Sequence, residues 1–352
     1  MRSPLFLIGL ILNMATAWAI VGAKTTGAIK ENVTHQPLMK PADGKFRMTF
    51  KPEDGPPKMI PTDRQEKDFA AFLGEDAQNV MARDEKTLCH SSNQDFLFLF
   101  RTADNMLRSS VHNFKGPLGT GVCWWMSDFQ FHFLFLTYVN PKAPRPTREA
   151  KQAIVQSILQ GKSVTELPGY ASLAEFMQDP EVQHIIKRQI SDKFLVDSFV
   201  KMRWANRKPP GNANDMSGEF RRIQTFLNTH KLPAPIYLDL PGPPAHTIFA
   251  VKVMEAATFG NVPPFHNILS LDSNAVPTQL SFTPSEAKFR AYMSWGGSVK
   301  RDKNNMPILD VLEPKVYLDH PERYHLIKAL LDGFCKSKGF KGPAKLQVPK
   351  AF

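Results

Sequence analysis

The sequence is poor in cysteine and lacks the short motifs that identify several enzyme classes. Three cysteines in 352 residues are too few for a scaffold built on disulfides, and no two of them form a C-x-x-C pair. The zinc-peptidase motif H-E-x-x-H, the serine-hydrolase motif G-x-S-x-G and the phosphate-binding P-loop motif do not occur in the chain. The sequence therefore predicts no metal site and no bound cofactor.

The composition is that of a folded protein with many connecting loops. Apolar residues make up 42% of the chain and charged residues 22%, and the 29 prolines are scattered rather than gathered in one tract. These values exclude a wholly disordered or collagen-like chain. The length suits one large domain or two modest ones, with a sizeable buried core.

The first residues resemble an export signal. Arg2 supplies a positive charge, residues 4–23 carry no ionisable side chain, and Ala17, Ala19 and Ala23 are small residues of the kind found at cleavage sites. We predict a cleaved signal peptide over residues 1–23 and a secreted or periplasmic protein with no transmembrane domain after cleavage. The competing interpretation is an uncleaved anchor, because about 20 uncharged residues just span a bilayer.

The remainder divides into an arm and a folded domain. Residues 24–61 carry glycine, proline and lysine with few periodic apolar positions, which predicts an extended arm or linker. Residues 62–352 form the predicted domain, in which helical patterns come first and short aromatic and β-branched runs follow. The strand-like runs are residues 236–240, 246–254, 267–271 and 279–282. This order predicts an α+β fold with a helical half followed by an antiparallel sheet half.

Several helix ends can be placed by their capping residues. Thr147 is expected to begin a helix that stops at Gly161, Ser172 opens a short one, and Asp179 followed by Pro180 opens another. A further helix is expected over residues 217–229 and a last one over 321–339. Residues 95–111 fit either a helix or a strand followed by a helix.

The chain is basic, with a formal net charge of +11. Removing residues 1–23 takes away only Arg2, so the mature chain has 43 minus 33, or +10. Basic residues stand in small groups and in a tail over residues 336–350. One interpretation is binding to an anionic cell-surface polymer through this tail, and the other is ordinary solvated helix faces. No aromatic-basic motif indicates nucleic-acid binding.

Cys123 stands in the most unusual local sequence. A glycine-rich turn, Gly119-Thr120-Gly121, leads into an apolar stretch over residues 124–139 that predicts a buried helix. Cys123 then lies at a helix N-terminus, where unpaired backbone N–H groups and the helix dipole stabilise a thiolate. The same N–H groups can receive an oxyanion. The alternative is that Cys123 is a small buried hydrophobic residue.

A thiolate nucleophile needs a histidine as base and a third group that orients the imidazole. His246 begins a predicted strand, and Asp272 ends the strand-like run that follows it about twenty residues later. If these two strands pair as an antiparallel hairpin, the start of the first lies beside the end of the second. The sequence therefore predicts that His246 and Asp272 are neighbours.

These segments resemble the papain-like cysteine peptidase superfamily. Gly121-Val122-Cys123-Trp124 is similar to the segment that opens the family's central helix, and Leu271-Asp272-Ser273 is similar to its strand-end Asn-Ser pair. The resemblance implies a papain-like fold with the nucleophile at the N-terminus of a central buried helix. It also implies that Cys123 is the nucleophile, His246 the general base and then acid, and Asp272 the residue that orients His246. The implied substrate is a peptide or an amide-bearing polymer.

Two departures from the family pattern keep other functions open. The family's oxyanion-hole glutamine lies six residues before the cysteine, where this chain has Pro117, and Asn113 is the substitute donor that we consider. Asp272 stands where peptidases of the family carry asparagine, whereas transglutaminase-like and amidase members use aspartate. The chain is therefore expected to be a thiol hydrolase, either peptidase or amidase. The alternatives are a transglutaminase-like acyl transferase or a non-catalytic envelope or adhesion protein that retains the fold.

The odd number of cysteines bears on the same question. In an oxidising compartment Cys89 and Cys335 can pair and leave Cys123 free. A disulfide between Cys123 and either of the others is the alternative, and it would exclude Cys123 from catalysis.

Overall fold

The structure is a computed structural model. It describes residues 48–49, 58–59, 81–111, 114, 122–197, 215–240, 245–259, 262–274, 278–293, 310–340 and 345–348. All of these belong to one compact unit that covers residues 35–352. The predicted signal peptide over residues 1–23 lies outside the described residues. Within the predicted arm, the described residues form two short antiparallel strands, β1 (Met48–Thr49) and β2 (Lys58–Met59).

The first half of the unit is helical, as expected. Its helices and its small parallel strand pair, β3 with β4, are α3 (Glu85–His90), α4 (Asn93–Ser110), α5 (Cys123–Leu136), β3 (Thr137–Asn140), α6 (Arg148–Gln160), β4 (Thr165–Pro168), α7 (Leu173–Gln178) and α8 (Pro180–Leu195). For residues 95–111 the helical alternative is right, because Ser92 and Asp95 form a capping box at the start of α4.

The predicted helix ends of this half are confirmed by their caps. The side chain of Thr147 accepts a hydrogen bond from the backbone of Ala150 at the start of α6, and Gly161 ends that helix in the left-handed region at φ 59°. A Cβ on Gly161 would lie 2.3 Å from the His132 ring, so glycine is required there for two reasons. Asp179 caps α8 with Pro180 in its first turn.

The second half is a curled antiparallel sheet with one helix before it and one after it. Its elements are α9 (Met216–His230), β5 (Ala234–Asp239), β6 (Ala245–Val253), β7 (Ala257–Phe259), β8 (Val262–Asp272), β9 (Gln279–Thr283), β10 (Lys288–Met293), β11 (Asp310–Leu312), β12 (Lys315–Leu318) and α10 (Arg323–Ser337). The strand order is β11-β10-β9-β8-β6-β5-β12, and β7 pairs with β8. The α+β class and all four predicted strands are confirmed, whereas β7, β10, β11 and β12 were not predicted.

The predicted helix over residues 124–139 is too long at its C-terminal end. Helix α5 stops at Leu136, and β3 follows directly. The buried guanidinium of Arg83 donates to the carbonyl oxygens of Leu134 (2.9 Å) and Thr137 (2.7 Å), which satisfies acceptors that the helix end leaves open. A cation at a helix C-terminus also complements the helix dipole.

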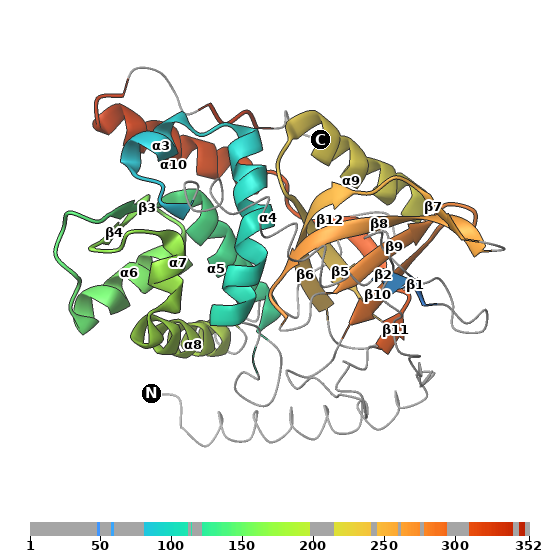
Figure 1. Ribbon diagram of the computed structural model, residues 1–352, viewed down its shortest axis with the longest axis horizontal. Coiled ribbons are helices and arrows are strands. Elements are labelled where there is room, and N and C mark those ends of the chain that lie inside the picture. Colours follow the sequence, from blue (N-terminus) through green and yellow to red (C-terminus); the bar gives the residue numbers. More distant parts are fainter. Residues whose placement is uncertain are drawn as a thin grey trace, which may run out of the picture. The chain divides into compact units, whose positions relative to one another are not determined.

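Helix α5 lies in the middle of the unit, and for that reason buried apolar side chains point out from all round its axis. It contacts α4, α6 and α8 among the helices and β6 in the sheet (Figure 1). Phe131 of α5, Phe100 of α4 and Phe249 of β6 pack against one another, with ring centroids 5.4 to 6.4 Å apart. This aromatic cluster joins the helical half to the sheet.

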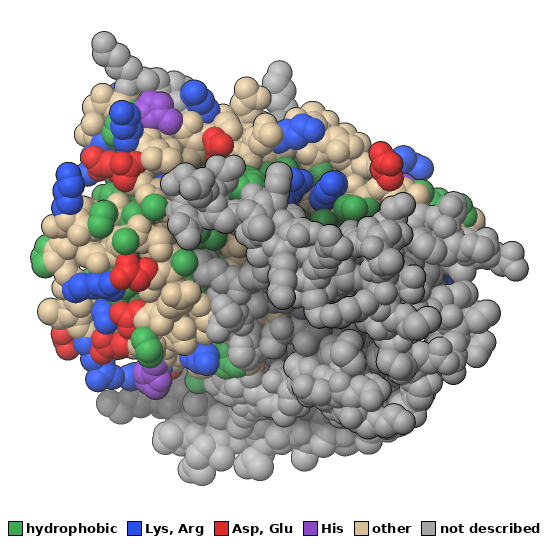
Figure 2. All heavy atoms as spheres, viewed as in Figure 1, with side chains coloured by type: hydrophobic (Ala, Val, Ile, Leu, Met, Phe, Trp, Pro, Cys, Tyr) green, Lys and Arg blue, Asp and Glu red, His purple; other side chains and the backbone are tan. Residues whose placement is uncertain are grey.

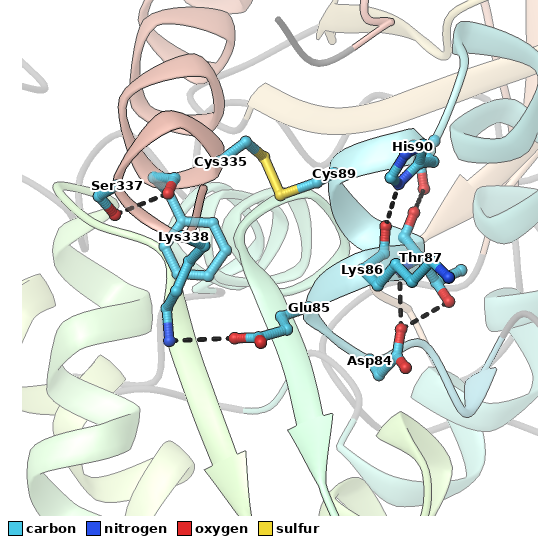
Figure 3. Close-up of a disulfide and its surroundings, with 11 residues drawn as sticks. Asp84, Glu85, Lys86, Thr87, Cys89, His90, Cys335, Ser337 and Lys338 are labelled. Carbon is cyan, nitrogen blue, oxygen red and sulfur yellow. Dashed lines mark hydrogen bonds and ion pairs between the residues drawn. A yellow bond between two sulfur atoms is a disulfide. The ribbon is translucent and has the colours of Figure 1, made fainter. Parts of the chain in front are cut away.

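A disulfide joins Cys89 of α3 to Cys335 of α10, with Cα atoms 5.6 Å apart (Figure 3). Both cysteines are buried. Of the pairings that the sequence leaves open, this one keeps Cys123 as the free thiol. Lys338, just beyond α10, forms an ion pair with Glu85 of α3 at 3.0 Å, so a second contact joins the same two elements.

We predict that the disulfide contributes substantially to stability. It closes a loop across 246 residues, and a native crosslink of this kind is worth about 2–5 kcal/mol. Replacing both Cys89 and Cys335 by serine should lower the free energy of unfolding in urea by that amount. Adding a reductant should lower the wild-type value and leave the double variant unchanged. Cys123→Ser serves as the matched control, and an equal loss of stability in that control would contradict the prediction.

Candidate active site

Cys123 is the first residue of α5, as predicted. The residue before it, Val122, takes the N-cap position and has no side-chain oxygen with which to cap the helix. The thiol is half-buried, whereas most of α5 behind it is fully buried. Backbone N–H groups of a helix's first turn point away from the helix body, and together with the helix dipole they favour negative charge at this position.

Two side chains of α5 hold the end of strand β6. The Cys123 thiol donates to the carbonyl oxygen of Ala245 at 3.4 Å, and the Ser127 hydroxyl donates to that of Thr247 at 2.9 Å. Toward the start of β6, its pairing with β8 ends at Ile248. The helix therefore binds the first residues of β6, which have no partner in β8. The two bonded carbonyls flank His246 in the sequence. The docking of α5 therefore places the thiol beside His246.

His246 and Asp272 form a buried pair. His246 Nε2 lies 2.7 Å from Asp272 Oδ1, and the two residues are 3% and 0% exposed. The pair exists because β6 and β8 are antiparallel neighbours whose last register pair is Ile248 with Asp272. The expectation that the start of one strand lies beside the end of the other is confirmed.

The carboxylate of Asp272 is held from both sides. Its Oδ1 accepts from the backbone N–H of Asn274 at 2.9 Å, and its Oδ2 accepts from that of Thr278 at 2.7 Å. Both donors belong to the segment that leaves β8 and enters β9. A carboxylate that receives backbone N–H groups in this way is fixed in orientation and stabilised in its charged form.

The electrostatics of the pair follow from these contacts. Burial lowers the pKa of His246, but the charge and hydrogen bond of Asp272 outweigh burial, and Cys123 adds a hydrogen bond and a charge interaction, so that the pKa rises to about 10. Burial raises the pKa of the Asp272 carboxyl, but His246 and the donors from Thr278 and Asn274 outweigh burial and lower it below its ordinary value. At neutral pH the pair is an imidazolium beside a carboxylate.

The first turn of α5 is also anchored on its other side. The indole Nε1–H of Trp125 donates to Asp197 Oδ2 at 3.0 Å, and Lys193 lies 3.2 Å from the same oxygen. Asp197, two residues beyond the end of α8, is 1% exposed. Sequence reasoning singled out neither Asp197 nor Ser127 nor Asn274. In the sequence these three are ordinary polar residues with no motif around them. Only the packing of α5 and the course of the chain after β8 bring them to the site.

Other predicted features fall where the structure makes no statement. Asn113, proposed as oxyanion donor, and the glycine-rich turn before Cys123 lie outside the described residues. In the described part of the chain, no three histidine, cysteine or acidic side chains gather as a metal site would require. None of the helices described here is both long and apolar enough to cross a bilayer.

Basic and acidic side chains alternate on the part of the surface formed by the described helices (Figure 2). Arg145 pairs with Glu175, and Lys151 lies 2.8 Å from both Asp179 and Glu181. In the predicted basic tail, Lys338 is paired with Glu85. For these described basic residues, the interpretation as solvated and paired helix faces fits better than a continuous anion-binding surface.

Comparisons with known proteins add nothing to this geometry. No family model, no curated protein and no solved structure matches the chain. The functional argument therefore depends on the residues of the site.

We predict that the buried pair makes stability depend on pH in a defined direction. Because the pKa of His246 is raised by folding, its contribution is complete below about pH 6.5, the unfolded value, and is lost as the pH rises through about 10. Because the pKa of Asp272 is lowered, its contribution is complete above about pH 4 and is lost as the pH falls further.

The Asp272→Asn variant tests this dependence. At pH 6 its free energy of unfolding should be about 3–5 kcal/mol lower than that of the wild type, and this difference should shrink toward pH 10. The measurement is urea unfolding across this pH range. Asp332→Asn is the matched control, because it removes the carboxylate of a partly exposed ion pair with Lys328. It should lower the free energy of unfolding by no more than about 1 kcal/mol. A wild-type advantage that stays constant up to pH 10 would refute the assignment.

Proposed function

We propose that the protein is a thiol hydrolase that cleaves peptide or amide bonds with Cys123, His246 and Asp272. One observation carries the proposal. A buried histidine, held at 2.7 Å by an aspartate, interacts with a half-buried thiol at a helix N-terminus. These are the three parts that activated-thiol chemistry needs: a nucleophile, a base and a group that orients the base.

The two nitrogens of His246 have separate roles in this mechanism. Nε2 faces Asp272, which leaves Nδ1 as the nitrogen for Cys123. In the reacting form His246 is the imidazolium, whose Nδ1 holds the proton given up by Sγ, and the Cys123 thiolate attacks the carbonyl carbon of the substrate. A carbon–sulfur bond forms and the carbonyl π electrons move to oxygen. The N–H groups in the first turn of α5 stabilise that oxyanion.

Collapse of the tetrahedral intermediate breaks the carbon–nitrogen bond. His246 gives its Nδ1 proton to the leaving amine, and an acyl group remains on Cys123 as a thioester. His246 then removes a proton from water, which attacks the thioester, releases the carboxylic acid and restores the thiol. An amine in place of water would give acyl transfer by the same steps, so product analysis separates hydrolase from transferase.

We also propose that the protein is a member of the papain-like superfamily, and the order of its elements supports this. The helical half precedes the sheet half, the cysteine starts a central buried helix, the histidine lies at a strand start, and the aspartate ends the strand paired with it. Export is proposed on the sequence of residues 1–23 and on the buried disulfide, since disulfides persist in oxidising compartments.

The direct test is a screen of peptide and amide substrates with wild type and Cys123→Ala. We expect hydrolysis by the wild type and a loss of at least about a thousandfold in the variant, because the other groups cannot replace the nucleophile. Asn140→Ala, which removes an amide hydrogen bond from β3 to Glu166 of β4, is the control and should retain activity. If Cys123→Ala hydrolyses as fast as the wild type, the proposal is wrong. If the wild type cleaves no substrate, the non-catalytic binding protein becomes the better description.

A second test needs no substrate. A free cysteine is almost wholly protonated at pH 6 and alkylates slowly. We expect iodoacetamide to label wild-type Cys123 readily at that pH, and we expect His246→Ala to slow labelling about tenfold or more, because the cation that stabilises the thiolate is removed. Intact mass measures the rate, and the disulfide leaves only one reactive site. Equal labelling rates in the two proteins would show that His246 does not activate the thiol.

A further inference from the structure

Asn274 contacts the same nitrogen of His246 as the aspartate does. Its side-chain amide, at the atom assigned as Nδ2, lies 3.2 Å from His246 Nε2, while Asp272 Oδ1 lies 2.7 Å from that nitrogen. Asn274 is 8% exposed, and its backbone N–H donates to Asp272 Oδ1. Two groups separated by one residue therefore converge on a single ring nitrogen.

The chemistry of that nitrogen fixes which end of the amide must face it. Asp272 is ionised at neutral pH, because its pKa is lowered, and an ionised carboxylate only accepts hydrogen bonds. Nε2 therefore carries a hydrogen toward Asp272 and has no lone pair free for a second donor. The oxygen and nitrogen of an asparagine amide exchange places on a half-turn and are assigned from the hydrogen-bond network. With its oxygen toward His246 the amide can accept this hydrogen, whereas its nitrogen could not.

We propose that Asn274 is a positioning residue whose amide oxygen shares the Nε2–H of His246 with Asp272. Two acceptors at different positions fix the plane of the imidazole, whereas one acceptor would leave it free to rock about a single hydrogen bond. The opposite nitrogen, Nδ1, is then held toward Cys123. A further acceptor dipole also stabilises the imidazolium form. The inference rests on the proposed role of His246 as base, but its central test requires no substrate.

The groups that face His246 come from three places. Asp272 at the end of β8 and Cys123 at the start of α5 are the titratable ones, and Asn274 is the neutral one. A change in the ionisation of His246 when Asn274 is replaced must therefore act through the lost acceptor, provided that the other two remain in place. Disulfide formation between Cys123 and another cysteine of the chain does not interfere, because Cys89 and Cys335 are bonded to each other.

The experiment follows the ring nitrogens of His246 by NMR in protein labelled with ¹⁵N-histidine, across pH 6 to 11. Asn274→Ala should lower the ionisation midpoint of His246 by about one pH unit, a tenfold change in its protonation equilibrium. Asn274→Asp restores an acceptor oxygen and should return the midpoint to the wild-type value or above. Asn140→Ala is the matched control and should leave the midpoint unchanged. A midpoint that is the same in Asn274→Ala and wild type overturns the inference, and so does an Asn274→Asp variant that behaves like Asn274→Ala.

Activity measured in parallel separates this inference from the proposed function. In an active enzyme the alkaline limb of the kcat/KM profile should move to lower pH in Asn274→Ala by the same amount, whereas a merely structural role would lower the amount of active protein at every pH alike. If the wild type hydrolyses nothing but the NMR midpoint shifts, the proposed function fails and the shared hydrogen bond stands. If the wild type is active and neither the midpoint nor the alkaline limb moves, the inference fails and the proposed function stands.

Discussion

The docking of α5 along the end of β6 is the contact on which the site depends. Cys123 and Ser127 are one helical turn apart, about 6 Å along the axis, and Ala245 and Thr247 are two strand residues apart, which is also about 6–7 Å. The two repeats match, so both hydrogen bonds form without distortion. Strand β6 is paired with β5 along its other side at the same residues. A slip of one residue would turn His246 to the opposite face of the sheet and separate it from both partners.

Contacts at both ends of α5 keep this docking in register. Arg83 binds carbonyl oxygens at the C-terminal end, and Asp197 binds Trp125 in the first turn. Between these ends, Phe131 packs on Phe249 of β6 with ring centroids 5.5 Å apart. A close-packed interior permits little sliding of one element past another, because each side chain already fills its space. The thiol therefore sits on an element that is fixed at its two ends and along its length.

Local signals in the sequence predicted much of the fold, the place of Cys123 at a helix start and the closeness of His246 to Asp272, and the limits of the prediction have physical causes. Helix caps such as Thr147 and Asp179 act through bonds within three residues, so the sequence alone reveals them. The pairing of His246 with Asp272 follows from the alternation of two adjacent strands. The end of α5 at Leu136 depends on Arg83, some fifty residues away, and the contact of Asn274 with His246 depends on the turn after β8. Such contacts between distant or irregular segments have no periodic pattern that would reveal them.

The arrangement of the three cysteines makes a free thiol compatible with an oxidising compartment. Cys89 and Cys335 are consumed by each other, and both are buried, at 5% and 0% exposure. Exchange between that disulfide and Cys123 would require the thiolate to reach a buried sulfur, which folding prevents. An odd cysteine is usually a liability in an exported protein, since it invites pairing with other chains. Here the odd cysteine is half-buried and held against the carbonyl of Ala245 beside His246. Half-burial limits how closely a second protein can approach this sulfur, so the packing that fixes Cys123 beside His246 also restricts unwanted pairing.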